Sequence, residues 1–427
     1  MSKRVLAAAM AAVLVITGCG SEPGDDGGQR TFKLWHYEGP DSAMGVAWAE
    51  AIKQFEATHP GVRVVFEEKG FEQIQKTAPM VLNSGDAPDV MEYNKGNATA
   101  GLLSKQGLLT DLTDEVTARG WDKQLSQGSQ TTARYDERGV MGAGKWFGVP
   151  NYAEYVRVFY NEDMFARQGI AVPATVEELT AAMDRFVAAG VTPLAVGGAE
   201  YPAHQIMYQL ALTKADKDWV DRFQRYTGPV NFHDAAWMYG ADTFADWVAK
   251  GYLSKDSAGM KAEDMGVAFM RGQHPVMISG TWWYGRLAAG IKDFRWGSVQ
   301  WPGLTAGSAG NMWVVPKGSK HKDLAYDFIA ITMSPQIQDK LADAGGVPVV
   351  DTGSPTTAAP QVKALTEDFK TLTAQDRLAF YPDWPAPGYY DVQVSAVQKL
   401  ITGTATPHQV MDELAKPYQE NLANVGG

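Results

Sequence analysis

The sequence predicts an α/β protein built from two lobes, on three observations. The chain has 427 residues, more than a single compact core usually contains. Apolar residues make up 45% of it and charged residues 20%, a composition typical of folded globular proteins. A pattern of alternating strands and helices starts near residue 31 and starts again after residue 150, so a boundary between two α/β units is expected near 150–155.

The first unit reads as strand, helix, strand. Ser42 can cap a helix that stops at the His-Pro-Gly sequence 59–61, and the apolar residues of this helix recur every three or four positions. Because strands alternate with helices, a mostly parallel sheet is expected. The expected strands are 31–37, 62–68 and 88–93.

The second unit repeats this alternation. Thr175 and Glu178 form a capping box for a helix that runs to about residue 189, and a second capping box, 406–409, opens the last helix. Other helices are expected at 234–250, 322–333 and 334–346, and strands at 155–161, 191–198, 274–280, 294–303 and 311–318. Three tryptophans lie on helical apolar stripes and are expected in the core: Trp48, Trp237 and Trp247.

The N-terminus has the pattern of a secretory signal peptide. Two basic residues precede an apolar run, 5–17, that spans roughly 20 Å as a helix, less than the ~30 Å hydrocarbon layer of a membrane. The run ends in Ile-Thr-Gly-Cys, which resembles the bacterial lipobox, and Cys19 is the only cysteine. We expect a signal peptide at 1–18 and a lipidated Cys19 with a flexible tether at 19–30, which would place the protein outside the cell on the outer face of the membrane.

Charge and motifs exclude several classes of function. The formal charge of −11 leaves no basic surface for phosphates, so no nucleic-acid partner is expected. The chain has no G-x-S-x-G sequence and no Walker loop, and the segment 142–148 breaks the dinucleotide spacing and is expected to be a turn. The seven histidines are scattered, so no metal site is expected. Because these motifs are missing, no cofactor and no catalytic residues are expected either. The enzyme alternative that remains is a pair of carboxylates flanking a sugar.

Aromatic residues beside polar planar residues are the positive signal. Sugars present C–H faces that lie flat on aromatic rings, and their buried hydroxyls need directed hydrogen-bond partners. In open α/β sheets, loops beyond the carboxyl ends of the strands hold ligands. Seven such stretches occur at expected strand ends and turns: 35–41, 91–97, 149–155, 197–204, 279–285, 309–315 and 381–391.

The chain resembles the extracellular solute-binding proteins of ABC sugar importers, in the maltose-binding-like group. The resemblance covers 32–422 and rests on these segments: AEAIKQFEATHPGVRV (49–64), GDAPDVMEYN (85–94), GVPNYAEYVRVFYNEDMFARQGI (148–170), GQHPVMISGTWW (272–283) and VVPKGSKHKDLAYDFI (314–329). It implies a periplasmic-binding-protein-like fold of type II, with a ligand cleft at the hinge. The lobes would be 31–153 plus 299–345, and 154–298 plus 346–427.

By position, the resemblance also implies a set of ligand-binding residues. They are Tyr37, Glu38, Asp41, Tyr93, Asn94 and Asn311 from the first lobe, and Glu154, Glu200, Tyr201, His204, Trp282, Trp283, Trp384 and Tyr389 from the second.

The function implied by the resemblance is capture of a neutral oligosaccharide by a monomer that then docks on the membrane permease subunits of an ABC importer. The loops 93–97 and 382–391 differ from those of maltose-binding members. The sequence as a whole resembles more closely the members that bind short β-1,4-linked xylo-oligosaccharides such as xylobiose. Two alternatives stay open: an exported glycoside hydrolase acting on short oligosaccharides, and a binder of peptides or cationic solutes.

The stretch SGTWWYGRL, 279–287, poses a packing question. Adjacent side chains point about 180° apart on a strand and about 100° apart on a helix, so Trp282 and Trp283 cannot share a face. One ring is expected under a sugar, and the other in the core or in the cleft wall. Spacing alone leaves both assignments open.

Overall fold

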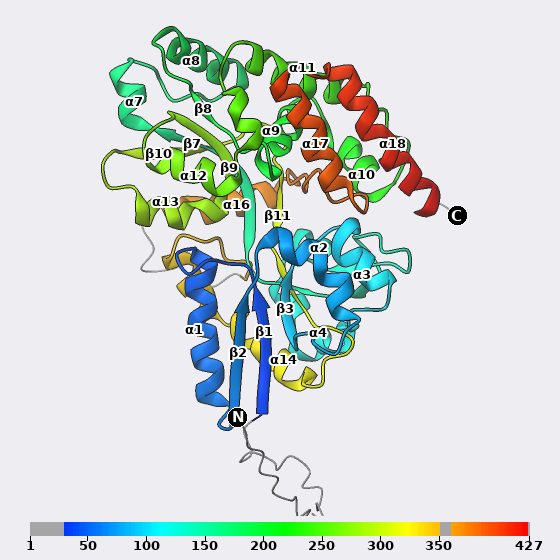
Figure 1. Ribbon diagram of the computed structural model, residues 1–427. Helices are drawn as coiled ribbons and strands as arrows, with labels where there is room; N and C mark the ends of the chain where they lie inside the picture. Colours follow the sequence, from blue (N-terminus) through cyan, green and yellow to red (C-terminus); the bar gives the residue numbers. More distant parts are fainter. Residues whose placement is uncertain (1–29, 351–359, 426–427) are drawn as a thin grey trace, which may run out of the picture.

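The structure is a computed structural model that describes residues 30–350 and 360–425. Two lobes, each built on its own sheet, lie one above the other, with the strands β7 and β11 at the junction (Figure 1). The expected signal peptide, Cys19 and most of the tether lie outside the described residues.

The first lobe is built on a five-stranded sheet flanked by helices. The strands in spatial order are β2 (Val62–Glu68), β1 (Arg30–His36), β3 (Val90–Tyr93), β12 (Met312–Val314) and β6 (Val149–Pro150). The helices of this lobe are α1 (Ala43–Thr58), α2 (Phe71–Leu82), α3 (Leu102–Lys105), α4 (Thr113–Arg119), α5 (Trp121–Gln124), α6 (Gln127–Thr131), α14 (Lys322–Thr332) and α15 (Pro335–Asp343), with a π-helical turn at Asn97–Gly101.

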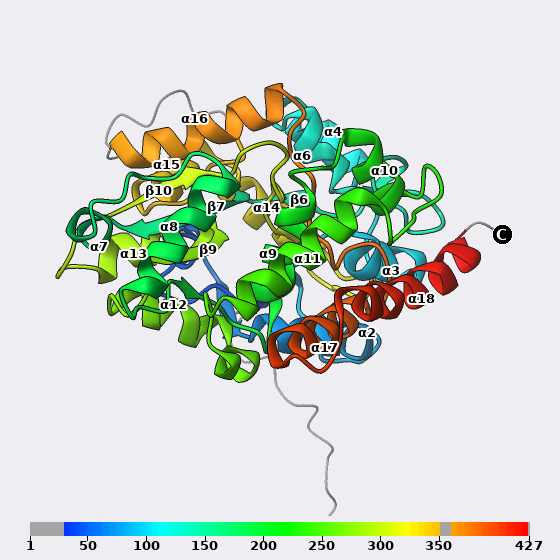
Figure 2. The same cartoon turned by 90° about the horizontal axis from the view of Figure 1, so that it is seen from above.

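The second lobe contains a smaller sheet and a group of long helices. The strands in spatial order are β10 (Trp296–Gln300), β7 (Ala153–Asn161), β9 (Val276–Gly280) and β8 (Leu194–Ala195), and β11 (Gly307–Ala309) also pairs with β7. Its helices are α7 (Glu162–Arg167), α8 (Val176–Ala188), α9 (Tyr201–Ala211), α10 (Lys217–Arg225), α11 (Ala235–Ala249), α12 (Ala262–Met270), α13 (Tyr284–Gly290), α16 (Pro360–Ala374), α17 (Tyr389–Thr402) and α18 (Pro407–Val425). Figure 2 shows α16 and the pair α17 and α18 on opposite sides of this lobe.

The expectation of mostly parallel sheets is met only in part. Strand β1 pairs in parallel with β2 and β3, and β8 pairs in parallel with β9. Strands β7 and β12 pair antiparallel with their neighbours β9, β10, β11, β3 and β6. These strands lie next to the crossings between lobes, and a chain that crosses back enters the sheet in the opposite direction.

Local signals for helix starts agree with the structure. The Ser42 hydroxyl accepts from the Gly45 amide at 2.9 Å at the start of α1. At the start of α18, the Thr406 amide donates to the Gln409 side chain at 2.9 Å, and the Gln409 amide donates back to the Thr406 hydroxyl at 3.3 Å. The expected core tryptophans Trp48, Trp237 and Trp247 are buried.

Three chain crossings lie side by side between the lobes. The Ala153 amide donates to the Val347 carbonyl at 2.8 Å, and Ala153 also pairs with Ala309 of β11. The Asn151 amide donates to the Asn311 carbonyl at 3.1 Å. The short junction has the form of a hinge rather than a linker. The expected division of the second lobe at residue 298 falls inside β10, which continues to Gln300 in the second sheet.

Candidate functional site

A cavity of about 730 Å³ lies between the lobes, within the range of about 300–1,000 Å³ typical of small-molecule sites. Both lobes and the junction contribute side chains. The lining residues are Tyr37, Glu38, Gly39, Pro40, Asp41, Ser42, Glu68, Gly70, Phe71, Glu72, Gln73, Asn94, Tyr152, Glu154, Glu200, Tyr201, Gln205, Lys261, Ala262, Glu263, Trp282, Trp283, Arg286, Asn311, Tyr381, Asp383, Trp384 and Tyr390.

Aromatic rings form one wall of this cavity. The half-buried Trp282 ring meets the rings of Tyr201 and Tyr381 edge to face, with centroid distances of 5.7 and 6.2 Å. Its indole nitrogen donates to the Tyr201 hydroxyl at 3.1 Å, which fixes the orientation of the ring. Tyr381 in turn contacts Trp384 at 5.4 Å, so the wall continues to the loop before α17. Rings at these separations are in favourable contact.

The two adjacent tryptophans have different surroundings. Trp283 is 3% exposed and packs in the second-lobe core, and a Cβ added to Gly266 of α12 would lie 2.1 Å from its ring. Trp282 stays half-buried beside Gly280, whose missing side chain leaves room for the ring. Both line the cavity, but Trp283 is mainly a core residue, and Trp282 presents its ring to the cleft.

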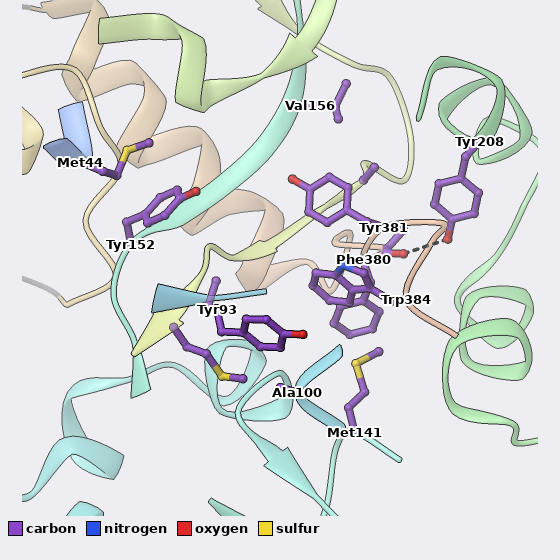
Figure 3. Close-up of a cluster of buried hydrophobic side chains, with 14 of the residues drawn as sticks. Met44, Tyr93, Ala100, Met141, Tyr152, Val156, Tyr208, Phe380, Tyr381 and Trp384 are labelled. Carbon is purple, nitrogen blue, oxygen red and sulfur yellow. Dashed lines mark hydrogen bonds between the residues drawn. The ribbon is translucent and has the colours of Figure 1, made fainter. Parts of the chain in front are cut away.

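A buried charge cluster forms the floor of the cavity near the junction. The Lys95 ammonium lies 3.6 Å from a Glu154 carboxylate oxygen, and its side chain is fully buried. The other Glu154 oxygen accepts from the Tyr152 hydroxyl at 2.9 Å, and that hydroxyl accepts from the Asn311 amide at 2.9 Å. Figure 3 shows Tyr152, Tyr381 and Trp384 gathered where the lobes meet.

Burial dominates the protonation of this cluster. Burial lowers the pKa of Lys95 to about 8, although Glu154 and Glu92 oppose this shift. Burial raises the pKa of Glu92 to about 8, and it raises the pKa of Glu154 against the opposing effect of Lys95. The pKa of Glu38 is raised by burial first, and then by repulsion from Glu92 and Glu154. Glu92 therefore keeps its proton near neutral pH and can donate as well as accept hydrogen bonds.

The loop at 94–97 packs against Trp384 of the second lobe. Gly96 has a φ of +104°, and an added Cβ would lie 2.6 Å from the Trp384 side chain. The Lys95 ammonium lies 5.4 Å from the Trp384 ring centroid, and the Ala98 amide donates to the Trp384 carbonyl at 2.8 Å. A glycine is required here both by the left-handed backbone and by the close approach. This contact joins the two loops in which the sequence departs from maltose-binding members.

A further part of the cavity lining is formed by Tyr390 with carboxylates of both lobes. The Tyr390 hydroxyl donates to Glu72 of α2 at 2.5 Å and accepts from the Tyr201 amide at 3.1 Å. Glu200 accepts from the Ala262 amide at 2.8 Å. The pKa of Asp383 is raised to about 7 by burial and by repulsion from Glu72 and Glu154.

The structure brings eleven of the fourteen expected ligand-binding residues to this cavity. They are Tyr37, Glu38, Asp41, Asn94, Glu154, Glu200, Tyr201, Trp282, Trp283, Asn311 and Trp384. Their role in ligand binding is a prediction.

The other three expected residues lie outside the cavity lining. Tyr93 is buried on β3 opposite Met312, because alternation along the strand turns it away from Asn94. His204 is buried on α9 behind the Tyr390 ring, with a centroid distance of 5.5 Å. Tyr389 packs on Tyr418 in the helical core.

The residue that follows each of these three lines the cavity instead, namely Asn94, Gln205 and Tyr390. Tyr390 follows Tyr389 and, about 100° further round α17, faces the cavity. Tyr381 and Asp383 lie in the aromatic stretch 381–391 but were not singled out. Glu72, Gln205, Glu263 and Arg286 carried no local signal, because their place in the cleft depends on how α2, α9, α12 and α13 pack.

In the described parts of the chain, 30–350 and 360–425, no group of three or more His, Cys, Asp and Glu side chains has an arrangement that could hold a metal ion. No helix in these ranges combines the length and the apolarity needed to cross a membrane.

Two α/β lobes joined by a hinge around a lined cavity define a two-lobed solute-binding protein of type II. A family model for bacterial extracellular solute-binding proteins matches residues 39–339. The chain belongs to this family.

Relatives and solved structures agree with this membership. The chain is 26% identical to the diacetylchitobiose binding protein DasA of Streptomyces coelicolor, over 97% of this chain and 99% of that one. It is 22% identical to the multiple sugar-binding protein of Streptococcus mutans, over 73% of each chain. A chitin oligosaccharide binding protein has the same fold, with a TM-score of 0.77, 22% identity and coverage of 93% of this chain and 100% of that one. A structure concerned with xylan utilization by the thermophilic bacterium Caldanaerobius polysaccharolyticus superposes with a TM-score of 0.75, at 19% identity, over 90% of this chain and 99% of that one.

Proposed function

We propose that this protein captures a short oligosaccharide outside the cell and delivers it to the permease subunits of an ABC importer. The observation that carries the proposal is the cavity between the lobes, which combines an aromatic wall with carboxylate, amide and hydroxyl groups. Trp282, Tyr201 and Tyr381 would contact the apolar faces of sugar rings. Glu38, Glu154 and Asn311 would satisfy the sugar hydroxyls, which are costly to bury unpaired.

A neutral, short β-1,4-linked xylo-oligosaccharide such as xylobiose is the proposed ligand. Three similar proteins support an oligosaccharide as the ligand class, because their names refer to diacetylchitobiose, to multiple sugars and to chitin oligosaccharides. The similar structure that concerns xylan utilization supports the choice of a xylose-based oligosaccharide as the ligand. Micromolar affinity requires only about −8 kcal/mol of net binding free energy, which a few stacked rings and paired hydroxyls can supply.

Closure of the lobes would couple capture to delivery. The two lobes, each built on its own sheet, would rotate about the three crossings near Ala153. The protein would act as a monomer without a cofactor. It would be held by a lipid on Cys19 at the outer face of the membrane, and the permease would recognise its closed form.

A calorimetric screen of the purified chain tests the proposal. Xylobiose, xylotriose, cellobiose, maltotriose and diacetylchitobiose should be titrated, and the products of long incubation analysed. Saturable binding of a β-1,4-linked sugar without release of monosaccharide supports capture. Monosaccharide release would favour the glycoside hydrolase, and absence of binding to the whole panel would contradict the function.

A further inference from the structure

Three carboxylates, Glu72, Glu200 and Asp383, line one end of the cavity. Among the described residues, Glu72 and Glu200 accept hydrogen bonds only from uncharged donors, the Tyr390 hydroxyl and the Ala262 amide. Asp383 is buried and forms no salt bridge with the described residues, and its carboxylate accepts a hydrogen bond from its own backbone amide. Repulsion between Asp383 and Glu72, and between Glu72 and Glu200, contributes to the raised pKa values of Asp383 and Glu72, although burial contributes most.

Positive groups near this end are already engaged or lie at its edge. Lys76 pairs with Asp391 at 3.5 Å on the exposed side of α2 and α17, and it lowers the pKa of Glu72 while Asp391 raises it. Lys95 pairs with Glu154 and also lowers the pKa of Asp383, by less than burial raises it. Lys261 lines the cavity from an exposed position before α12. His204 behind Tyr390 adds no charge at neutral pH, because burial lowers its pKa to about 3.

Unpartnered polar atoms indicate that a ligand completes the same region. The Tyr381 hydroxyl has no hydrogen-bond partner among the described residues, although Tyr381 is only 4% exposed and lines the cavity. In Figure 3 this hydroxyl points away from the loop that carries Phe380 and Trp384. The side-chain oxygen of Gln205 is also buried without a partner in the cavity lining. A buried polar atom without a partner is costly, so a bound molecule would stabilise both.

We infer that this end of the cavity, formed by Glu72, Glu200, Asp383, Tyr381 and Tyr390, is a subsite for an ammonium group, and that oligosaccharides bearing an amine bind more tightly than their neutral counterparts. The inference rests on the proposed oligosaccharide function and extends its ligand class. An ammonium donates up to three hydrogen bonds to carboxylates and is attracted by tyrosine rings. A neutral sugar leaves the repulsion between the carboxylates in place, but an amine relieves it.

The matched probes are two β-1,4-linked disaccharides, cellobiose and the glucosamine dimer. They share ring number and linkage, and they differ by an amine in place of one hydroxyl on each ring. At pH 6.5 and low salt we expect the glucosamine dimer to bind at least tenfold more tightly. This advantage should shrink as salt is raised to about 0.5 M, because screening weakens charge interactions and not stacking. Binding of the dimer should also release protons, seen as a dependence of the calorimetric heat on the buffer, because a nearby cation favours ionised Asp383.

Two variants distinguish the contribution of this subsite to amine binding from the contribution of the overall negative charge of the protein. Asp383→Asn should reduce the ratio of the two affinities at least fivefold, whereas Glu420→Gln, which removes an exposed carboxylate of α18 outside the cavity lining, should leave the ratio within twofold. Equal affinity of the native protein for both sugars would overturn the subsite and leave oligosaccharide capture intact. If spermidine binds as tightly as the glucosamine dimer, the result would contradict a carbohydrate ligand. If neither sugar binds, the result would count against the proposed function as well as against the subsite.

Discussion

Arg286 of the second lobe donates to Asp41 of the first lobe, with 2.9 Å between its Nε and the carboxylate Oδ2. The two terminal nitrogens of the same guanidinium hold both oxygens of Glu263 at 2.7 Å, and the group lies over the Trp283 ring. Asp41 follows β1, and Arg286 lies on α13, which follows β9. Both residues line the cavity, so this contact connects the two lobes at the cavity.

The first prediction concerns this contact. Asp41→Asn should lower ligand affinity about two- to fivefold, mainly through faster dissociation, because partly exposed ion pairs contribute only about 0.2–1 kcal/mol. Stopped-flow fluorescence gives the two rate constants. In a double-mutant cycle with Arg286→Gln, the coupling energy should account for most of the loss. Independent, additive effects of the two changes would show that the contact does not stabilise the closed form.

The second prediction separates the two tryptophans. Trp283→Ala should lower the free energy of unfolding by about 3–5 kcal/mol, as large-to-small changes of buried aromatic residues do. Trp282→Ala should instead weaken sugar binding about tenfold or more with a smaller loss of stability, because its ring faces the cleft. Urea denaturation and calorimetry of both variants check this. If Trp282→Ala leaves the affinity unchanged, its stacking role is wrong.

The third prediction concerns stability and pH. The pKa of buried Glu92 is raised from 4.5 to about 8, so between these values the folded state holds a proton that the unfolded state has lost. The free energy of unfolding should therefore fall as pH rises from about 5 to 8, with a slope of up to about 1.4 kcal/mol per pH unit for each such group. Lys95, with its pKa lowered to about 8, adds a slope of the opposite sign only above pH 8.

Urea titrations at several pH values test this slope. Glu92→Gln keeps the oxygen that accepts from Asn151 at 2.7 Å and should flatten the slope by up to one proton. Glu420→Gln removes an exposed carboxyl of α18, far along the chain from the cluster, and should leave the slope as it is. Stability that rises between pH 5 and 8 in the native protein would be incompatible with the buried carboxyls.

The fourth prediction concerns the anchor. Cys19→Ala should remove the acceptor of the lipid and release the protein into the medium, which immunoblots of membrane and culture fractions detect. Cys19→Ser serves as a second variant of nearly unchanged size. Full retention of both variants in the membrane fraction would mean that another part of the protein holds it there.

The sequence alone determined the α/β class, the core tryptophans, the helix caps and most strands, because these depend on side-chain periodicity and on hydrogen bonds between near neighbours. It also indicated the loops that meet at the cleft. Which residue of a pair faces the cavity was decided by the tertiary structure: Tyr390 rather than Tyr389, and Trp282 rather than Trp283 as the open ring. The difference depends on where one strand or helix ends and how its neighbour packs, and local spacing does not carry that information. The same holds for Lys95, Glu72 and Arg286, whose charges gained their partners only when segments distant in the chain came together.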